Sequence, residues 1–228
     1  MDVNWYTSSL TLIWVDYAIL VISVLFTAVN YKRFDPDVRW LVWLLWFALA
    51  IESGSKLYLL HWVPGSNHYL LHLYTIGEFW LLSYCYRDLL QLSPTQREKF
   101  TYTTLALGTI ISTYSVLCLL EPERLPSESV QWYNKVVVNA ALMVYSSWLF
   151  ARIIQSPGKF RHLSRGVVML NSGVMLYYSA TFLLFLTFEF LVEEAFKQTL
   201  AVWFCYTLLI FVLHITMLRS VWLLRGVR

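Results

Sequence analysis

Charged residues are scarce in this chain, and that scarcity bounds its class. Only 14% of the 228 residues are charged, and 58% are hydrophobic. An ordinary soluble domain carries roughly a quarter charged residues. The deficit favours a protein that places most of its surface in lipid. A soluble helical domain is the alternative, but it gives no reason for apolar runs of roughly 20 residues to recur along the chain.

Cysteine is also rare, and the short motifs of familiar enzymes are missing. Cys85, Cys118 and Cys205 have no CxxC spacing, and an odd number cannot all form disulfides, so we expect small apolar fillers. No glycine-rich phosphate loop or GxSxG elbow occurs. The net charge of +3 is small and shows no basic stripe with interleaved aromatics, which excludes nucleic acid as a partner.

What the chain does have is seven long apolar runs separated by proline, glycine and aspartate. No proline falls inside a run, and no loop exceeds about a dozen residues. The pattern predicts an all-α polytopic membrane protein, a seven-helix bundle that forms a single domain over residues 1–228. The predicted spans are 10–31, 38–62, 68–90, 100–120, 130–154, 166–190 and 198–224.

Loop charges predict the orientation of this bundle. Lysine and arginine flank the first, third and fifth breaks and the C-terminus, whereas the alternate breaks carry mostly glutamate. By the positive-inside rule, the N-terminus lies outside and the C-terminus in the cytoplasm. The deciding cations are Lys32, Arg33, Arg39, Arg87, Arg97, Lys99, Arg152, Lys159, Arg161, Arg165, Arg219, Arg225 and Arg228.

Short matches between the two halves of the chain indicate a parallel internal repeat of three helices, a connector helix and three helices. Chance similarity between apolar helices is the competing explanation. The matched segments are Val15–Val21 with Val138–Val144, Glu52–Tyr58 with Asn171–Tyr177, and Tyr74–Ile76 with Tyr206–Leu208.

Ionisable residues inside these spans are the candidate site, because burying them at membrane depth is costly. Glu52 and Lys56 stand one helical turn apart in the order that favours an ion pair. Counting residues along the spans places most polar groups in the outer half, Asp16 among them, and leaves His214 near the inner end of the last span. The candidate ligand-binding residues are Asp16, Glu52, Lys56, His72, Glu78, Asn139, Asn171 and Tyr177.

Histidines at the outer end suggest a second chemistry. His68 and His72 are four residues apart, a spacing compatible with shared metal ligation, and His61 could add a third ligand. A divalent metal there would activate water for a membrane hydrolase. No acidic residue stands at the HExxH position, so solvent-facing or hydrogen-bonded histidines are the simpler explanation.

The segment His72–Tyr84, HLYTIGEFWLLSY, and the segment that begins NSG at Asn171 resemble a group of uncharacterised bacterial seven-helix membrane proteins. That resemblance implies a bacterial cytoplasmic membrane and no particular activity. The parallel repeat resembles sugar transporters built from two three-helix units, although their repeat prolines are missing here. The topology resembles seven-helix receptors without their short motifs. No lysine stands near the middle of the last span, so we expect no retinal.

These observations favour a receptor or sensor module. A small ligand would enter from the outer face, and a cytoplasmic or membrane partner would carry the signal, since the chain has no output domain of its own. A small-solute transporter made of two three-helix repeats is the first alternative, and a membrane-embedded metal-dependent hydrolase the second. The sequence assigns no catalytic residue and no cofactor, and binding is favoured over catalysis.

Overall fold

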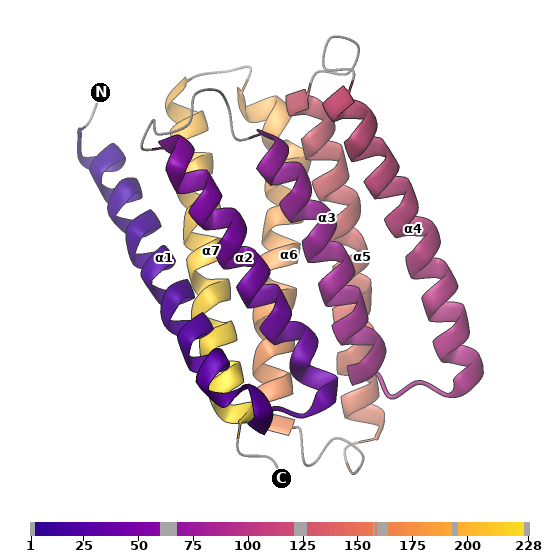
Figure 1. Cartoon of the computed structure of the whole chain (residues 1–228). Coiled ribbons are helices and arrows are strands. Elements are labelled where there is room, and N and C mark those ends of the chain that lie inside the picture. Colours follow the sequence, from indigo (N-terminus) through magenta and orange to yellow (C-terminus); the bar gives the residue numbers. More distant parts are fainter. Residues whose placement is uncertain are drawn as a thin grey trace.

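Seven α-helices make up the computed structural model of this chain (Figure 1). The structure describes residues 3–59, 68–120, 127–156, 158, 164–192 and 196–225. Two short 3₁₀ turns, Tyr31–Arg33 and Pro36–Val38, connect the first two helices. The helices are α1 (Val3–Asn30), α2 (Arg39–Leu59), α3 (His68–Leu89), α4 (Pro94–Leu120), α5 (Ser127–Gln155), α6 (Ser164–Val192) and α7 (Phe196–Leu224).

Each predicted span lies on one of these helices to within a few residues, except that residues 60–62 at the end of the second span lie outside the described residues. Helix α4 begins well before its span. The sequence Ser-Pro-Thr-Gln at 93–96 sets that start. The Gln96 backbone N–H donates to Ser93 Oγ at 3.4 Å, and the Ser93 backbone N–H donates to Gln96 Oε1 at 3.3 Å. This reciprocal capping, with Pro94 at the first helical position, is a strong helix-start signal. Helix α4 therefore extends beyond its apolar part.

Six of the helices are long and apolar enough to cross a membrane, judged over the described residues. Helix α3 is not among them, because it carries His72, Glu78, Arg87 and Asp88. Many large apolar side chains are exposed on the outside of the bundle, including Val29 on α1 and Leu120 on α4. Exposed apolar side chains on this scale fit a membrane protein.

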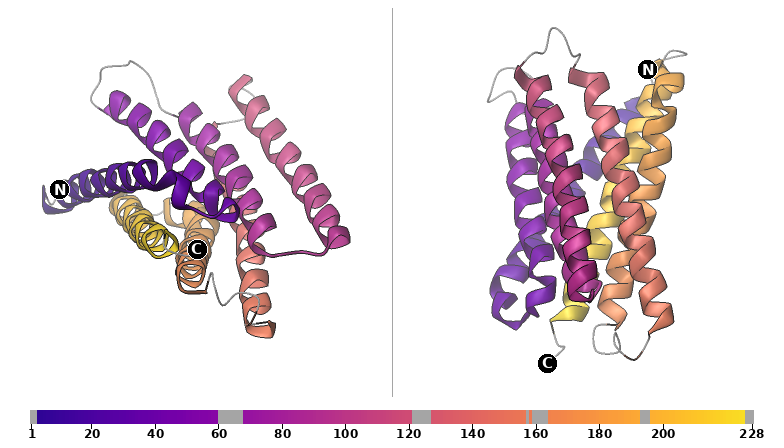
Figure 2. Two further views of the ribbon diagram at one scale, coloured as in Figure 1. Left: turned by 60° about the horizontal axis from the view of Figure 1, so that its bottom comes forward. Right: turned by 90° about the vertical axis from the view of Figure 1, so that its right-hand side faces the viewer.

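Six helices form a closed ring, and the seventh lies outside it. Around the ring, α1 packs on α2, α2 on α3, α3 on α5, α5 on α6, α6 on α7, and α7 on α1. Helix α4 packs only against α3 and α5 among the principal helix contacts, at the periphery (Figure 2). We call the end of the bundle where α1, α3, α5 and α7 begin the N-terminal face, and the opposite end the C-terminal face (Figure 1).

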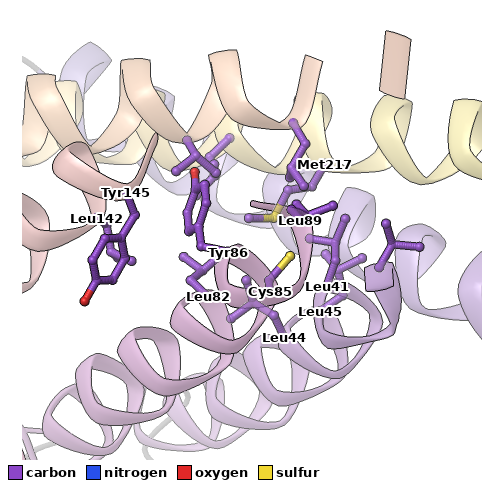
Figure 3. Packing of buried hydrophobic residues seen from close by; sticks show 14 of the residues in the cluster. Leu41, Leu44, Leu45, Leu82, Cys85, Tyr86, Leu89, Leu142, Tyr145 and Met217 are labelled. Carbon is purple, nitrogen blue, oxygen red and sulfur yellow. The ribbon is translucent and has the colours of Figure 1, made fainter. Parts of the chain in front are cut away.

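Apolar side chains fill the C-terminal half of the ring. Leu41 and Leu45 of α2 lie against Leu82 and Leu89 of α3, with Met217 of α7 close by (Figure 3). All five are buried, and the spacing of four residues on α2 and of seven on α3 puts each pair of leucines on one face of its helix. This packing fixes the positions of α2, α3 and α7 around the ring.

A glycine lets the peripheral helix approach. A Cβ at Gly108 of α4 would collide with the indole of Trp80 on α3. The Trp80 Nε1–H also donates to Ser112 Oγ on α4 at 3.4 Å. Trp80 thus occupies a slot that only glycine provides, and it anchors α4 to the outside of α3.

Candidate functional site

An ion pair between two ring helices is the most enclosed charged feature of the described chain. Lys135 of α5 pairs with the Oε2 of Glu78 on α3, and their side chains are only 6% and 1% exposed. The two residues are 57 positions apart in sequence, and the packing of α3 on α5 brings them together. Burial of both partners makes the pair strongly dependent on its immediate surroundings.

Tyrosines from three helices surround this pair. Tyr74 lies one turn before Glu78 on α3, and Lys135 Nζ is 5.2 Å from the centroid of its ring. Tyr177 and Tyr178 of α6 are both buried, with their rings edge to face at a centroid distance of 4.8 Å. We call Lys135, Glu78, Tyr74, Tyr177, Tyr178 and Tyr206 the interior cluster.

Tyr206 extends the interior cluster to α7. Its hydroxyl is a hydrogen-bonding neighbour of Tyr177 and interacts electrostatically with Lys135 and Glu78. Each of the four tyrosine hydroxyls lies within electrostatic range of the Glu78 carboxylate. Four helices of the ring therefore direct polar groups toward one carboxylate.

Two polar atoms in the interior cluster are unsatisfied. Glu78 Oε1 and the Tyr178 hydroxyl are buried and form no hydrogen bond of normal geometry within the described chain. They are nevertheless hydrogen-bonding neighbours of each other, and the Tyr74 hydroxyl is a further hydrogen-bonding neighbour of the Glu78 carboxylate. Buried polar atoms in folded proteins nearly always have partners, because an orphan group costs about 1–3 kcal/mol. The Glu78 carboxylate is therefore bonded less completely than is usual for a buried group.

The predicted pair of Glu52 and Lys56 is formed at the edge of this cluster. Lys56 Nζ lies 3.1 Å from Glu52 Oε2, with side chains 12% and 32% exposed respectively. The ammonium is also 5.9 Å and 5.8 Å from the ring centroids of Trp14 and Tyr17 on α1. Glu52 acts electrostatically on Tyr74 and Tyr206, so its charge reaches the interior cluster.

Asp16 has a partner that the sequence placed at a different depth. His214 Nδ1 lies 2.8 Å from Asp16 Oδ1, and both side chains are buried between α1 and α7. Counting residues from the predicted span ends put Asp16 in the outer half and His214 near the inner end. That expectation was wrong, because α1 and α7 are both long and the two residues meet at one level.

The two asparagines are part of helix-to-helix contacts. Asn139 of α5 and Thr181 of α6 are hydrogen-bonded at 3.0 Å. Asn171 of α6 accepts from the Tyr86 hydroxyl at 2.8 Å and donates to the Ser146 carbonyl at 2.9 Å. Asn171 thus joins α3, α5 and α6 with its amide group hydrogen-bonded on both sides.

Asn171 and Glu52 lie at different depths in the bundle. Asn171 contacts Tyr86 near the end of α3, whereas Glu52 acts on Tyr74 nearer its beginning. From the sequence match of Glu52–Tyr58 with Asn171–Tyr177, we expected these two residues at equivalent positions. The polar residues of the two proposed repeats therefore do not lie at one depth in the bundle.

The histidine cluster is described only in part. His72 is buried in α3, while His61 lies outside the described residues, as does the side chain of His68. Within the described part of the chain, no group of three or more His, Cys, Asp or Glu residues could hold a metal ion. The metal site predicted at His61, His68 and His72 thus falls largely outside what the structure describes.

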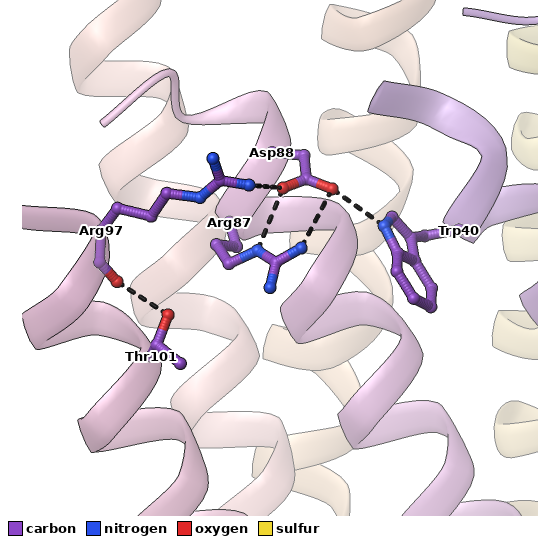
Figure 4. A network of polar contacts seen from close by, with 5 residues as sticks. All are labelled: Trp40, Arg87, Asp88, Arg97 and Thr101. Carbon is purple, nitrogen blue, oxygen red and sulfur yellow. Dashed lines mark hydrogen bonds and ion pairs between the residues drawn. The ribbon is translucent and has the colours of Figure 1, made fainter. Parts of the chain in front are cut away.

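A separate polar network lies at the C-terminal face. Asp88 accepts from Trp40 Nε1 at 2.8 Å, from Arg87 Nε at 3.0 Å and from Arg97 at 3.0 Å (Figure 4). Arg152 donates to the carbonyls of Leu90 and Gln91 at 3.3 Å and 3.1 Å, which closes the end of α3. In this network, each charged or carbonyl group has a partner.

The candidate residues chosen from the sequence include only two of the six members of the interior cluster, Glu78 and Tyr177. Lys135 and Tyr178 were not among those candidates, and Tyr74 and Tyr206 were noted only as matching repeat positions. The spacing of Tyr74 and Glu78 on one helical face was the available signal. The partner on α5 could be found only once the ring order was known.

Comparison with protein-family models, curated proteins and solved structures finds no match to this chain.

Proposed function

We propose that this protein is an integral membrane receptor or sensor that binds a small polar ligand at the interior cluster. The observation that carries the proposal is the buried pair of Lys135 and Glu78, enclosed by tyrosines on three helices. A charged pair and aromatic side chains that converge inside a helical ring mark a candidate ligand site.

The energetic cost of the pair supports a functional role. A buried ion pair adds little stability compared with well-packed apolar side chains of the same size. The packed leucines of the C-terminal half hold the ring together without any such charge. A role in recognising a ligand explains why the bundle keeps a buried charged pair at a place where apolar packing alone would hold the helices together.

The proposed location is the bacterial cytoplasmic membrane, with the N-terminal face outside. Arg33, Arg87, Arg97, Arg152 and Arg225 all belong to the opposite, C-terminal face. The positive-inside rule places such a face in the cytoplasm. The interior cluster then lies in the outer half of the bundle, and a cytoplasmic or membrane partner would read the signal at the arginine-rich face.

Binding to the purified protein tests this proposal. The full chain in lipid nanodiscs is screened against classes of small polar molecules, and its thermal unfolding temperature is recorded. A ligand at 100 times its Kd should stabilise the protein by about 2.7 kcal/mol. That stabilisation should vanish in Glu78→Gln and Lys135→Gln.

Exposed neighbours on α4 provide matched controls. Glu98→Gln and Lys99→Gln make the same chemical changes at exposed positions, and stabilisation should persist in both. A ligand that stabilises wild type and the Glu78→Gln variant equally would place its site elsewhere and contradict the proposal. So would the absence of any stabilising class, combined with normal behaviour of cells that carry Glu78→Gln.

A transporter built from two three-helix units is the second candidate. The ring order favours it, whereas the different depths of Glu52 and Asn171 count against the repeat. A twofold axis that maps α1, α2 and α3 onto α5, α6 and α7 would also map the α3·α5 contact onto the α7·α1 contact. Under that axis the connector α4 lies outside, as it does here. Tyr74 and Tyr206, which the repeat pairs with each other, also interact in the interior.

Flux separates the two candidates. If the protein is a transporter, proteoliposomes that contain the full chain should take up a solute down its concentration gradient. That uptake should stop in the variant Gly173→Leu. A side chain at Gly173 would meet Thr216 of α7 and block relative movement of α6 and α7. Binding without flux for a ligand that stabilises the protein would leave only the receptor.

A further inference from the structure

We infer that the ligand of the interior cluster is a small zwitterion, with a primary ammonium group and a carboxylate on one short skeleton, as in a small α-amino acid. This inference rests on the proposed function and names the ligand class of the same site. The ligand ammonium would bind Glu78 and the ligand carboxylate would bind Lys135. The two side chains would then pair with the ligand instead of with each other.

Charge balance is the first argument. The interior cluster holds one cation, Lys135, and one anion, Glu78, and the nearby Lys56 and Glu52 also cancel. A ligand with a single net charge would leave one buried charge unmatched, which is strongly unfavourable in the interior. A zwitterion adds no net charge and supplies a partner for each member of the pair.

The second argument is that this pair can open. Lys135 and Glu78 stand on different helices, α5 and α3, so a small relative movement of those helices separates them. Glu52 and Lys56 stand four residues apart on one helix, which holds their backbones at a fixed spacing. Of the two Lys–Glu pairs described in the bundle, only the interhelical one can admit a ligand between its members.

The third argument concerns the ammonium end. The Lys135 ammonium already lies 5.2 Å from the Tyr74 ring centroid, so the aromatic wall accepts a cation at this place. Glu78 Oε1 and the Tyr178 hydroxyl are hydrogen-bonding neighbours, but neither forms a hydrogen bond of normal geometry. A primary ammonium has N–H donors for both groups, whereas a quaternary ammonium has none.

The test compares glycine with its single-charge and methylated relatives on the wild-type protein. Full-length protein in nanodiscs is titrated with glycine, acetate, methylamine, acetamide and glycine betaine, and both calorimetry and thermal unfolding are recorded. We expect glycine to bind at least about tenfold more tightly than acetate, methylamine or betaine, because each of those leaves a buried group unpaired. Alanine serves as a second α-amino acid probe.

Variants locate the effect. Lys135→Gln and Glu78→Gln should each weaken glycine binding by at least about tenfold, while the exposed-site controls Glu98→Gln and Lys99→Gln retain it. The charge-swapped double variant, Lys135→Glu with Glu78→Lys, should regain part of the lost affinity, since it again offers one group of each sign. Binding of glycine that survives in Lys135→Gln would overturn the inference.

The outcomes also separate this inference from the proposed function. If acetamide, acetate or methylamine binds as tightly as glycine and loses affinity in Glu78→Gln, the receptor site stands and the zwitterion does not. If neither glycine nor alanine binds but another class of polar molecule binds at the interior cluster, the receptor site again stands and the zwitterion does not. If no class binds there, both proposals fail.

Discussion

Two polar networks of the bundle differ in how completely their groups are bonded. Around Asp88 and Asn171, in the C-terminal half, Asp88 has three donors and Asn171 is bonded through both of its amide atoms. In the interior cluster, Glu78 Oε1 and the Tyr178 hydroxyl lack a hydrogen bond of normal geometry. The contrast holds for these two networks and not for the whole halves, since Arg39 Nε and Ser83 Oγ of the C-terminal half are also buried without a hydrogen-bond partner in the described chain. A fully bonded network rigidifies a structure, and for that reason we propose the interior cluster, rather than the networks of Asp88 and Asn171, as the binding site.

The largest expected effect comes from removing the cation of the interior cluster. Lys135→Met leaves the Glu78 carboxylate buried and unpaired, and should lower the free energy of unfolding by about 3–5 kcal/mol. Reversible unfolding in mixed detergent micelles measures this loss. The double variant Lys135→Met with Glu78→Leu should recover most of it, because no charge remains unmatched. A double variant as unstable as the single one would show that packing, not charge, holds this region.

The next largest loss of stability should come from Asn171, whose amide group is hydrogen-bonded on both sides. Asn171→Leu removes the acceptor of the Tyr86 hydroxyl and the donor to the Ser146 carbonyl, and we expect a loss of about 2–4 kcal/mol. The same detergent unfolding measures it. Ser172→Ala is the control, since that exposed hydroxyl bonds only to Val168 on its own helix and should cost under about 0.5 kcal/mol. Equal losses in both variants would mean that Asn171 does not join the three helices.

The helices themselves were readable from the sequence because hydropathy and helix breakers are local signals. Pro94, after the capping residue Ser93, and the aspartates around Pro36 mark boundaries that need no tertiary information. Helix α3 shows the limit of this approach. Its polar residues lower its hydropathy, and they stand there because α3 packs against α2, α4 and α5.

The site was less readable because its members come from different helices. Glu52 and Lys56 attracted attention because their spacing on one helix is visible in the sequence. Glu78 and Lys135 form the more deeply buried pair, and nothing local links residues 57 positions apart. The level at which Asp16 and His214 meet likewise depends on how α1 and α7 pack, which span lengths do not determine.

A smaller effect is expected at the C-terminal face. Asp88→Asn keeps an acceptor for Trp40 Nε1 but removes the charge that faces Arg87 and Arg97. The network lies at the end of the bundle and is partly exposed, so the loss of stability should be about 1 kcal/mol. Thermal unfolding at low and high salt measures it, and the difference between variant and wild type should shrink as salt screens the pairs. A loss that is independent of salt would contradict this account.

The smallest effect is expected at the pair that the sequence made most visible. Lys56→Met should lower the free energy of unfolding by less than about 1 kcal/mol, because Glu52 is partly exposed and can be solvated once its partner is gone. The methionine can also keep contact with the rings of Trp14 and Tyr17 that Lys56 now covers. The same substitution at Lys135 should cost several times more, although both lysines pair with a glutamate. Similar losses at the two positions would mean that burial does not distinguish them, and the interior cluster would lose its claim to be the binding site.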